Sequence, residues 1–66
     1  MYNDEAFMAL VNERGVKLEA VALAMGIHPA TLLRKRKGEA EFTRAEIQAC
    51  CEFFNLPEMN AVFFAH

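Results

Sequence analysis

One stretch of 21 residues, from Leu18 to Gly38, constrains the fold of this chain more than any other: LEAVALAMGIHPATLLRKRKG. Its first apolar residues follow the three- and four-residue spacing of a helix, and this pattern stops at Gly26, a residue type that readily ends helices. A second helix can begin at Pro29, because the missing N–H of proline costs nothing in the first turn. The stretch therefore predicts two short helices, over about 18–25 and 29–37, joined by a tight glycine turn.

Helix signals flank this stretch on both sides. Asn3 is a good N-cap for a helix over about 4–14, and Gly15 can end that helix in a left-handed conformation. Thr43 and Glu46 have the spacing of a capping box, in which each side chain binds a backbone N–H of the other residue. They predict a fourth helix that runs to about Asn55. The residues expected on its inner face are Ile47, Cys50, Cys51 and Phe54.

A short fifth helix is expected from Pro57 to about Phe64, and no segment alternates with the period of a strand. The chain has 66 residues, 55% of them hydrophobic, which suffices for one small core. The sequence thus predicts an all-α fold with four to five helices in a single domain over residues 1–66. A domain of this size has little room for a substrate cleft, and no nucleophile–base pair is visible, so we expect no enzyme.

Charge is unevenly distributed along the chain. The net charge is −2, yet residues 34–37 are all basic, while the rest of the chain has three basic residues against nine acidic ones. A local positive field of this kind suits a polyanion such as nucleic acid, and an acidic remainder helps to orient the approach. The alternative is that residues 34–37 only form a solvated helix end that interacts with the helix dipole.

The two cysteines, Cys50 and Cys51, are adjacent, so a disulfide between them would be strained and both are expected as free thiols. Free thiols are typical of a reducing cytoplasm. The spacing of the cysteines with His28 and His66 does not suggest zinc, so neither a metal nor a cofactor is expected. The N-terminal residues MYNDEAF are acidic, and no apolar run reaches membrane length, which favours a cytoplasmic protein without a membrane anchor. If the basic run binds DNA, the protein is expected to be nucleoid-associated.

The helix pair over 18–37 resembles the helix-turn-helix of the lambda-repressor-like (Cro/XRE-type) family of DNA-binding proteins, especially its short phage-related members. The residues that carry the resemblance are Val21, Ala22, Met25, Gly26, Ile27 and Leu32. Further likeness lies in Arg34-Lys35, Lys37-Gly38-Glu39, Phe42-Thr43 with Glu46-Ile47, and Val62-Phe63-Phe64. In this family an aliphatic residue is usual near the end of the helix that corresponds to 29–37. The chain departs from that pattern, because residues 34–37 are all charged. Either Lys35 or Arg36 must therefore bury its aliphatic stem.

The resemblance implies that the helix over 29–37 enters the major groove of duplex DNA and that residues near its N-terminus touch the bases. Pro29 and Ala30 offer only apolar surface there, which is unusual for a reading helix. Thr31 and His28 are candidates for phosphate binding, or are only helix-start residues. The expected DNA-binding residues are Lys17, His28, Pro29, Ala30, Thr31, Leu33, Arg34, Lys35 and Lys37.

Among these residues, Arg34 is the best candidate to read a base, because a guanidinium group pairs bidentately with guanine. The alternative for Arg34 is an ion pair with Glu39 or Glu41. Lys35 and Lys37 are expected to bind phosphates rather than bases.

These features favour a sequence-specific, duplex DNA-binding transcriptional regulator, such as a repressor of phage or mobile-element origin. A monomer this small makes few contacts with DNA, so a homodimer on two half-sites is expected. The dimer surface is expected at Met59, Val62, Phe63 and Phe64, unless Phe63 and Phe64 fold under the core. The alternative function is a protein-interaction module, an antirepressor or adaptor, that has this fold and does not bind DNA. Neither a membrane nor a small-molecule partner is expected.

Overall fold

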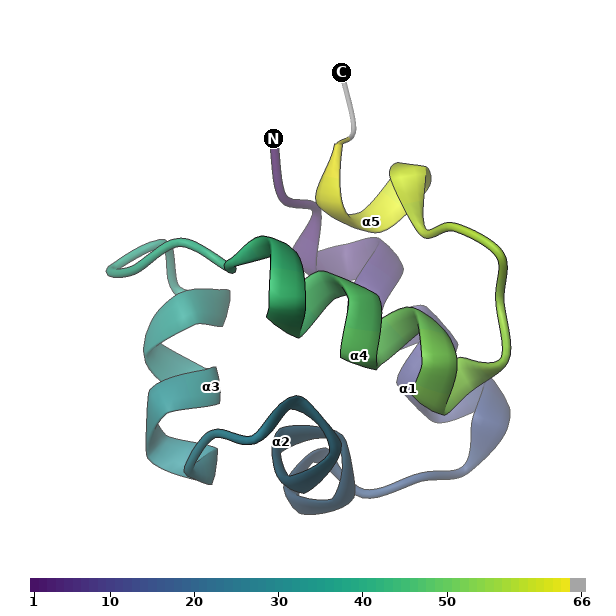
Figure 1. The fold of residues 1–66 in the computed structure, drawn as a ribbon, viewed down its shortest axis with the longest axis horizontal. Coiled ribbons are helices and arrows are strands. Elements are labelled where there is room, and N and C mark those ends of the chain that lie inside the picture. The colour runs from purple at the N-terminus through teal and green to yellow at the C-terminus, as the bar shows by residue number, and fades with distance from the viewer. Residues whose placement is uncertain (65–66) are drawn as a thin grey trace.

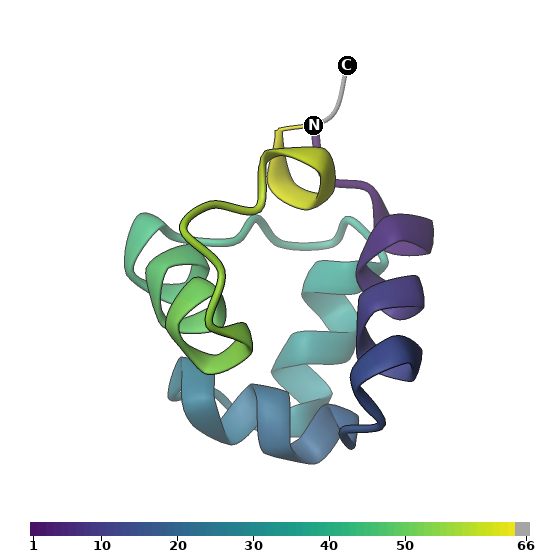
Figure 2. The same cartoon turned by 90° about the vertical axis from the view of Figure 1, so that its right-hand side faces the viewer.

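Five α-helices follow one another along the chain in a computed structural model that describes residues 1–64 (Figure 1). No strand occurs among these residues, so the all-α prediction is confirmed. In both views α5 and the N-terminus lie at one end of the molecule and α2 lies at the other (Figures 1 and 2). The helices are α1 (Asp4–Arg14), α2 (Leu18–Met25), α3 (Pro29–Arg36), α4 (Arg44–Phe54) and α5 (Asn60–Phe63).

The two ends of α1 and the start of α4 are formed by the residues that the sequence predicts for them. The side chain of Asn3 accepts a hydrogen bond from the backbone N–H of Ala6 at 3.0 Å, and Gly15 ends α1 with φ +65°. At the start of α4, Thr43 Oγ1 accepts from the N–H of Glu46, and Glu46 Oε1 accepts from the N–H of Thr43 at 2.9 Å. These caps satisfy N–H groups that have no partner inside the helix, so they fix where each helix begins.

The core lies between α2 and α4, which pack together more extensively than any other pair of helices. From α2, Val21 and Ala22 are fully buried, and from α4, Cys50 and Phe54 are buried with them. Ala22 has no side chain beyond Cβ, and small residues of this kind allow two helices to approach closely. The other buried apolar residues are Phe7, Val11, Met25, Leu32, Met59, Val62 and Phe63.

The fifth helix is shorter than the sequence predicts, because it begins at Asn60 instead of Pro57. Met59 adopts a non-helical backbone conformation (φ −130°, ψ 49°), and its side chain is directed into the core. The N–H of Asn3 donates to the carbonyl of Val62 at 2.6 Å, which ties α5 to the start of α1. Tertiary packing of Met59 therefore overrides the helix start that Pro57 favours.

The position of α5 also corrects the predicted dimer surface. Met59, Val62 and Phe63 are all buried in the core of the monomer, and only Phe64 is exposed. Three of the four residues expected to meet a second copy are therefore unavailable. Within residues 1–64, no helix combines the length and the apolar character that crossing a bilayer requires.

Candidate nucleic-acid interface

A tight turn around Gly26 joins α2 to α3. Gly26 has φ +76°, a conformation that costs an L-residue with a side chain about 1–2 kcal/mol. The N–H of Ile27 donates to the carbonyl of Ala22 at 3.0 Å, which closes the end of α2. His28 Nδ1 then accepts from the N–H of Ala30 at 3.0 Å, so His28 caps α3, and Pro29 occupies the first turn. The turn predicted around Gly26 is confirmed.

Helix α3 has one buried and one exposed face, and it lies at the edge of the molecule (Figure 1). Leu32 and Lys35 are buried, and Thr31 and Arg36 are half-buried. The exposed face consists of Pro29, Ala30, Leu33, Arg34 and Lys37, the last of which is the C-cap residue. These positions recur every three or four residues, so the five side chains form one continuous surface.

Lys35 is not on this surface, contrary to the expectation that it binds phosphate. Its side chain is 9% exposed, and its Nζ lies 2.5 Å from Glu46 Oε1, the same oxygen that caps α4. The ring of Phe42 lies beneath the ammonium group, with its centroid 6.0 Å away. The charge of Lys35 is thus paired inside the fold, where it joins α3 to α4.

The Glu46 carboxyl responds to this environment. Burial alone raises its pKa, but hydrogen bonds from Lys35 and from the N–H of Thr43, together with the charge of Lys35, outweigh burial and hold the pKa below its usual value. Glu46 is therefore ionised at neutral pH and forms an ion pair with little access to water.

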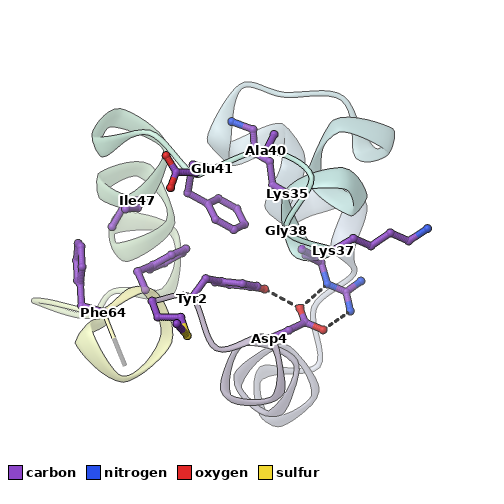
Figure 3. Close-up of a pocket in the computed structure, with 13 residues that line it drawn as sticks. Tyr2, Asp4, Lys35, Lys37, Gly38, Ala40, Glu41, Ile47 and Phe64 are labelled. Atoms are coloured by element: carbon purple, nitrogen blue, oxygen red, sulfur yellow. Dashed lines mark hydrogen bonds and ion pairs between the residues drawn. The ribbon is translucent and has the colours of Figure 1, made fainter. Parts of the chain in front are cut away.

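A second ion pair joins the end of α3 to the start of α1. Arg36 Nε and one terminal nitrogen contact the two oxygens of Asp4 at 2.8 and 3.1 Å, and Tyr2 donates its hydroxyl hydrogen to Asp4 at 2.6 Å (Figure 3). The Arg36 hydrogen bonds hold the pKa of Asp4 below its usual value. Burial, with the hydrogen bond to Asp4, raises the pKa of Tyr2, so the phenol stays protonated.

The basic run 34–37 therefore presents less free charge than its sequence indicates. Lys35 and Arg36 are paired with acids of the body, and only Arg34 and Lys37 are exposed. Arg34 Nε lies 3.7 Å from Glu39 Oε1, and both side chains are more than half exposed, so this contact is weak and leaves the guanidinium accessible. Lys17 and His28, which the sequence also predicts to contact DNA, are exposed as well.

Part of this arrangement was open to prediction. Lys35 follows the buried Leu32 by three positions, and that spacing places it on the inner face of α3. The sequence predicts its partner Glu46 only as a capping residue, and it gives no sign that Asp4 binds Arg36. Neither acid carries a sequence signal that points to α3, because the partners lie 11 and 32 residues apart along the chain.

An apolar groove lies near α5, and its larger hollow extends to Lys37 at the end of α3. Two adjoining hollows of about 710 and 520 Å³ share Phe42, Ile47 and Phe64 in their walls. Phe64 is 52% exposed, and Met1, which also lines the larger hollow, is 91% exposed. Arg44 and Glu58, both exposed, lie along the smaller hollow. The groove offers an apolar floor with charges of both signs at its edge.

The two cysteines of α4 differ in their exposure to solvent. Both are free thiols; Cys50 is fully buried and Cys51 is half-buried. Burial, with a smaller effect of the neighbouring Cys51, raises the pKa of Cys50 to about 12. Within residues 1–64, no three His, Cys, Asp or Glu side chains lie close enough to hold a metal ion; His66 lies outside these described residues.

No protein-family model matches the chain, and no curated protein or solved structure matches it either. The resemblance to lambda-repressor-like regulators therefore stays a prediction that rests on the residues of α2, the turn and α3.

Proposed function

We propose that this protein is a sequence-specific, duplex DNA-binding transcriptional regulator in which α2, the Gly26 turn and α3 act as a helix-turn-helix. The observation that carries the proposal is the two-faced α3, whose inner face is anchored by Leu32 and Lys35 while Pro29, Ala30, Leu33, Arg34 and Lys37 stay exposed. A helix held in this way at the edge of a small domain can enter the major groove, which is wide enough to admit one helix.

Two kinds of contact with DNA follow from the exposed face. Arg34, with only the weak contact to Glu39, can turn its guanidinium to a guanine edge, where it forms two parallel hydrogen bonds. Lys37 and Lys17 are exposed ammonium groups that suit phosphates, and His28 and Thr31 flank the start of α3. Lys35 has no place in the interface, because its ammonium is paired with Glu46.

A homodimer remains part of this proposal. Its interface is the apolar groove near α5 that contains Phe64, and not the surface that the sequence predicted. Two copies related by a two-fold axis need a self-complementary surface. The groove meets that need, because an exposed arginine and an exposed glutamate, Arg44 and Glu58, lie along the same apolar hollow. Sedimentation of the wild type and of Phe64→Ser tests this: a dimer that becomes a folded monomer supports it, and a monomeric wild type overturns it.

The test of DNA binding is fluorescence anisotropy with random-sequence duplex DNA over a range of salt concentrations. The variant is Arg34→Ala/Lys37→Ala, and the control is Arg14→Gln, which removes an exposed arginine outside both α3 and the groove. Each lost phosphate contact reduces the dependence of log K on log salt by about 0.9. We expect binding that weakens steeply with salt, a smaller slope in the double variant and an unchanged slope in the control. A folded protein that does not bind at low salt would overturn the proposal.

The second candidate function is a protein-interaction module that does not bind DNA. The groove around Phe64 favours it, because a large exposed aromatic residue beside an apolar hollow is typical of protein-binding surfaces. Salt-dependent DNA binding that depends on Arg34 and Lys37 excludes this candidate as the sole function.

A further inference from the structure

The exposed face of α3 divides into an apolar half and a cationic half. Pro29, Ala30 and Leu33 lie in the N-terminal half, where Leu33 is 45% exposed, and Arg34 and Lys37 follow. The polar groups near the apolar half are already engaged or partly covered: His28 Nδ1 accepts from the N–H of Ala30, and Thr31 is half-buried. The exposed side chains of α3 in this half are therefore hydrocarbon.

The charges around α3 determine which half approaches DNA. Beyond its C-terminal end, Glu39 and Glu41 are exposed acids that phosphates repel. On the inner side of that end, Lys35 and Arg36 are held by Glu46 and Asp4 and cannot swing outward without breaking their pairs. The apolar N-terminal half therefore lies deepest in the groove, with Arg34 beside it.

Only one group in the major groove suits such a surface. Base edges there carry hydrogen-bond donors and acceptors, except for the C5-methyl group of thymine. Apolar side chains placed against the other edges would leave those polar groups unpaired and dehydrated, which is costly. When the same side chains pack against thymine methyl groups, apolar surface of both the protein and the DNA is removed from water, which is favourable.

The dimensions of α3 set the number of methyl groups. Pro29 and Leu33 are four residues apart, or about 6 Å along the helix axis at 1.5 Å per residue. Successive base pairs are about 3.4 Å apart, so this surface spans about two of them. We propose that Pro29, Ala30 and Leu33 select two adjacent thymine methyl groups, next to a guanine that Arg34 reads. This inference rests on the proposed function and adds the base chemistry to it.

The test begins with a pool of random duplexes from which the protein selects its preferred sequences. The enriched duplexes are then made twice, with thymine and with deoxyuridine, a change that removes only the C5-methyl group. Loss of one buried methyl group corresponds to about a fourfold loss of affinity, so two give about 15-fold. We expect the thymine duplexes to bind more tightly by about this factor.

A pair of matched variants assigns the effect to α3. Leu33→Gln exchanges an exposed leucine of α3 for a polar residue of similar size, and Leu23→Gln does the same on α2, where Leu23 is 80% exposed. We expect Leu33→Gln to have a smaller preference for thymine over deoxyuridine, because Pro29 and Ala30 remain, with its salt dependence unchanged, and Leu23→Gln to keep both.

The outcomes separate this inference from the proposed function. Sequence-selective, salt-dependent binding that is equal for thymine and deoxyuridine duplexes overturns the thymine inference and leaves the regulator proposal intact. DNA binding that enriches no sequence overturns the thymine inference and also the sequence specificity of the proposed regulator. If Leu33→Gln keeps the full preference for thymine, the assignment of that preference to α3 is overturned. Absence of any DNA binding by the folded protein overturns both proposals.

Discussion

Replacing Lys35 by methionine separates a structural lysine from one that binds DNA. Methionine keeps most of the apolar length of the side chain and removes the ammonium group, so Glu46 loses its partner at 2.5 Å. Glu46 is only 12% exposed and keeps one hydrogen bond, from the N–H of Thr43. The carboxylate left behind is thus poorly hydrated, and the substitution should destabilise the fold.

The magnitude follows from the burial of the pair. A hydrogen bond to a charged group contributes about 1.5–3 kcal/mol, and removing one partner of a fully buried pair costs about 3–5 kcal/mol. Because about a tenth of each side chain remains exposed, we expect about 2 kcal/mol for Lys35→Met. In a domain of this size, 1 kcal/mol shifts Tm by about 4–8 °C, so Tm should fall by about 8–16 °C.

The assay is thermal unfolding followed by circular dichroism, beside two controls. Lys37→Met removes an exposed ammonium from the end of the same helix and should change stability by less than about 0.5 kcal/mol. The double variant Lys35→Met/Glu46→Gln leaves no unpaired charge and keeps a residue that can complete the capping box, so it should recover part of the loss.

DNA binding supplies the second readout for the same variants. Lys37→Met should reduce the salt slope by about 0.9, while Lys35→Met should leave the slope unchanged. The reasoning would be refuted if Lys35→Met were no less stable than Lys37→Met, or if its salt slope fell by the same amount.

Three further predictions concern pH, thiol chemistry and the core. The pKa of Glu46 is lower in the folded protein than its usual 4.5, so its contribution is complete above that pH and is lost as pH falls through the folded value. Urea unfolding from pH 7 to 3 should therefore depend less on pH in Glu46→Gln than in the wild type. With a thiol reagent at pH 7, Cys51 should react faster than Cys50, whose fully buried thiol has a pKa near 12, and Cys51→Ala should abolish the fast phase. Phe54→Ala should cost about 3–5 kcal/mol, comparable with the whole stability of a small domain, and circular dichroism should show a largely unfolded chain at 25 °C.

Local sequence determined most of the helix boundaries. Asn3, Gly15, Gly26 and the Thr43–Glu46 capping box act through hydrogen bonds or backbone conformations within a few residues, so the sequence alone contains the relevant interactions. The inner faces of α1, α2 and α4 follow from helical spacing for the same reason.

The interactions that only the tertiary structure decided are those between residues that are far apart in the sequence. Whether Lys35 contacts solvent or Glu46, and whether Arg36 is free or bound to Asp4, depends on how α3 packs against α4 and α1. The late start of α5 has the same origin, because the burial of Met59 outweighs the local preference at Pro57. The sequence alone determined where α1 to α4 lie and that a basic run ends α3. Which of those charges remains free for a partner depended on long-range ion pairs, which leave no periodic trace in the sequence.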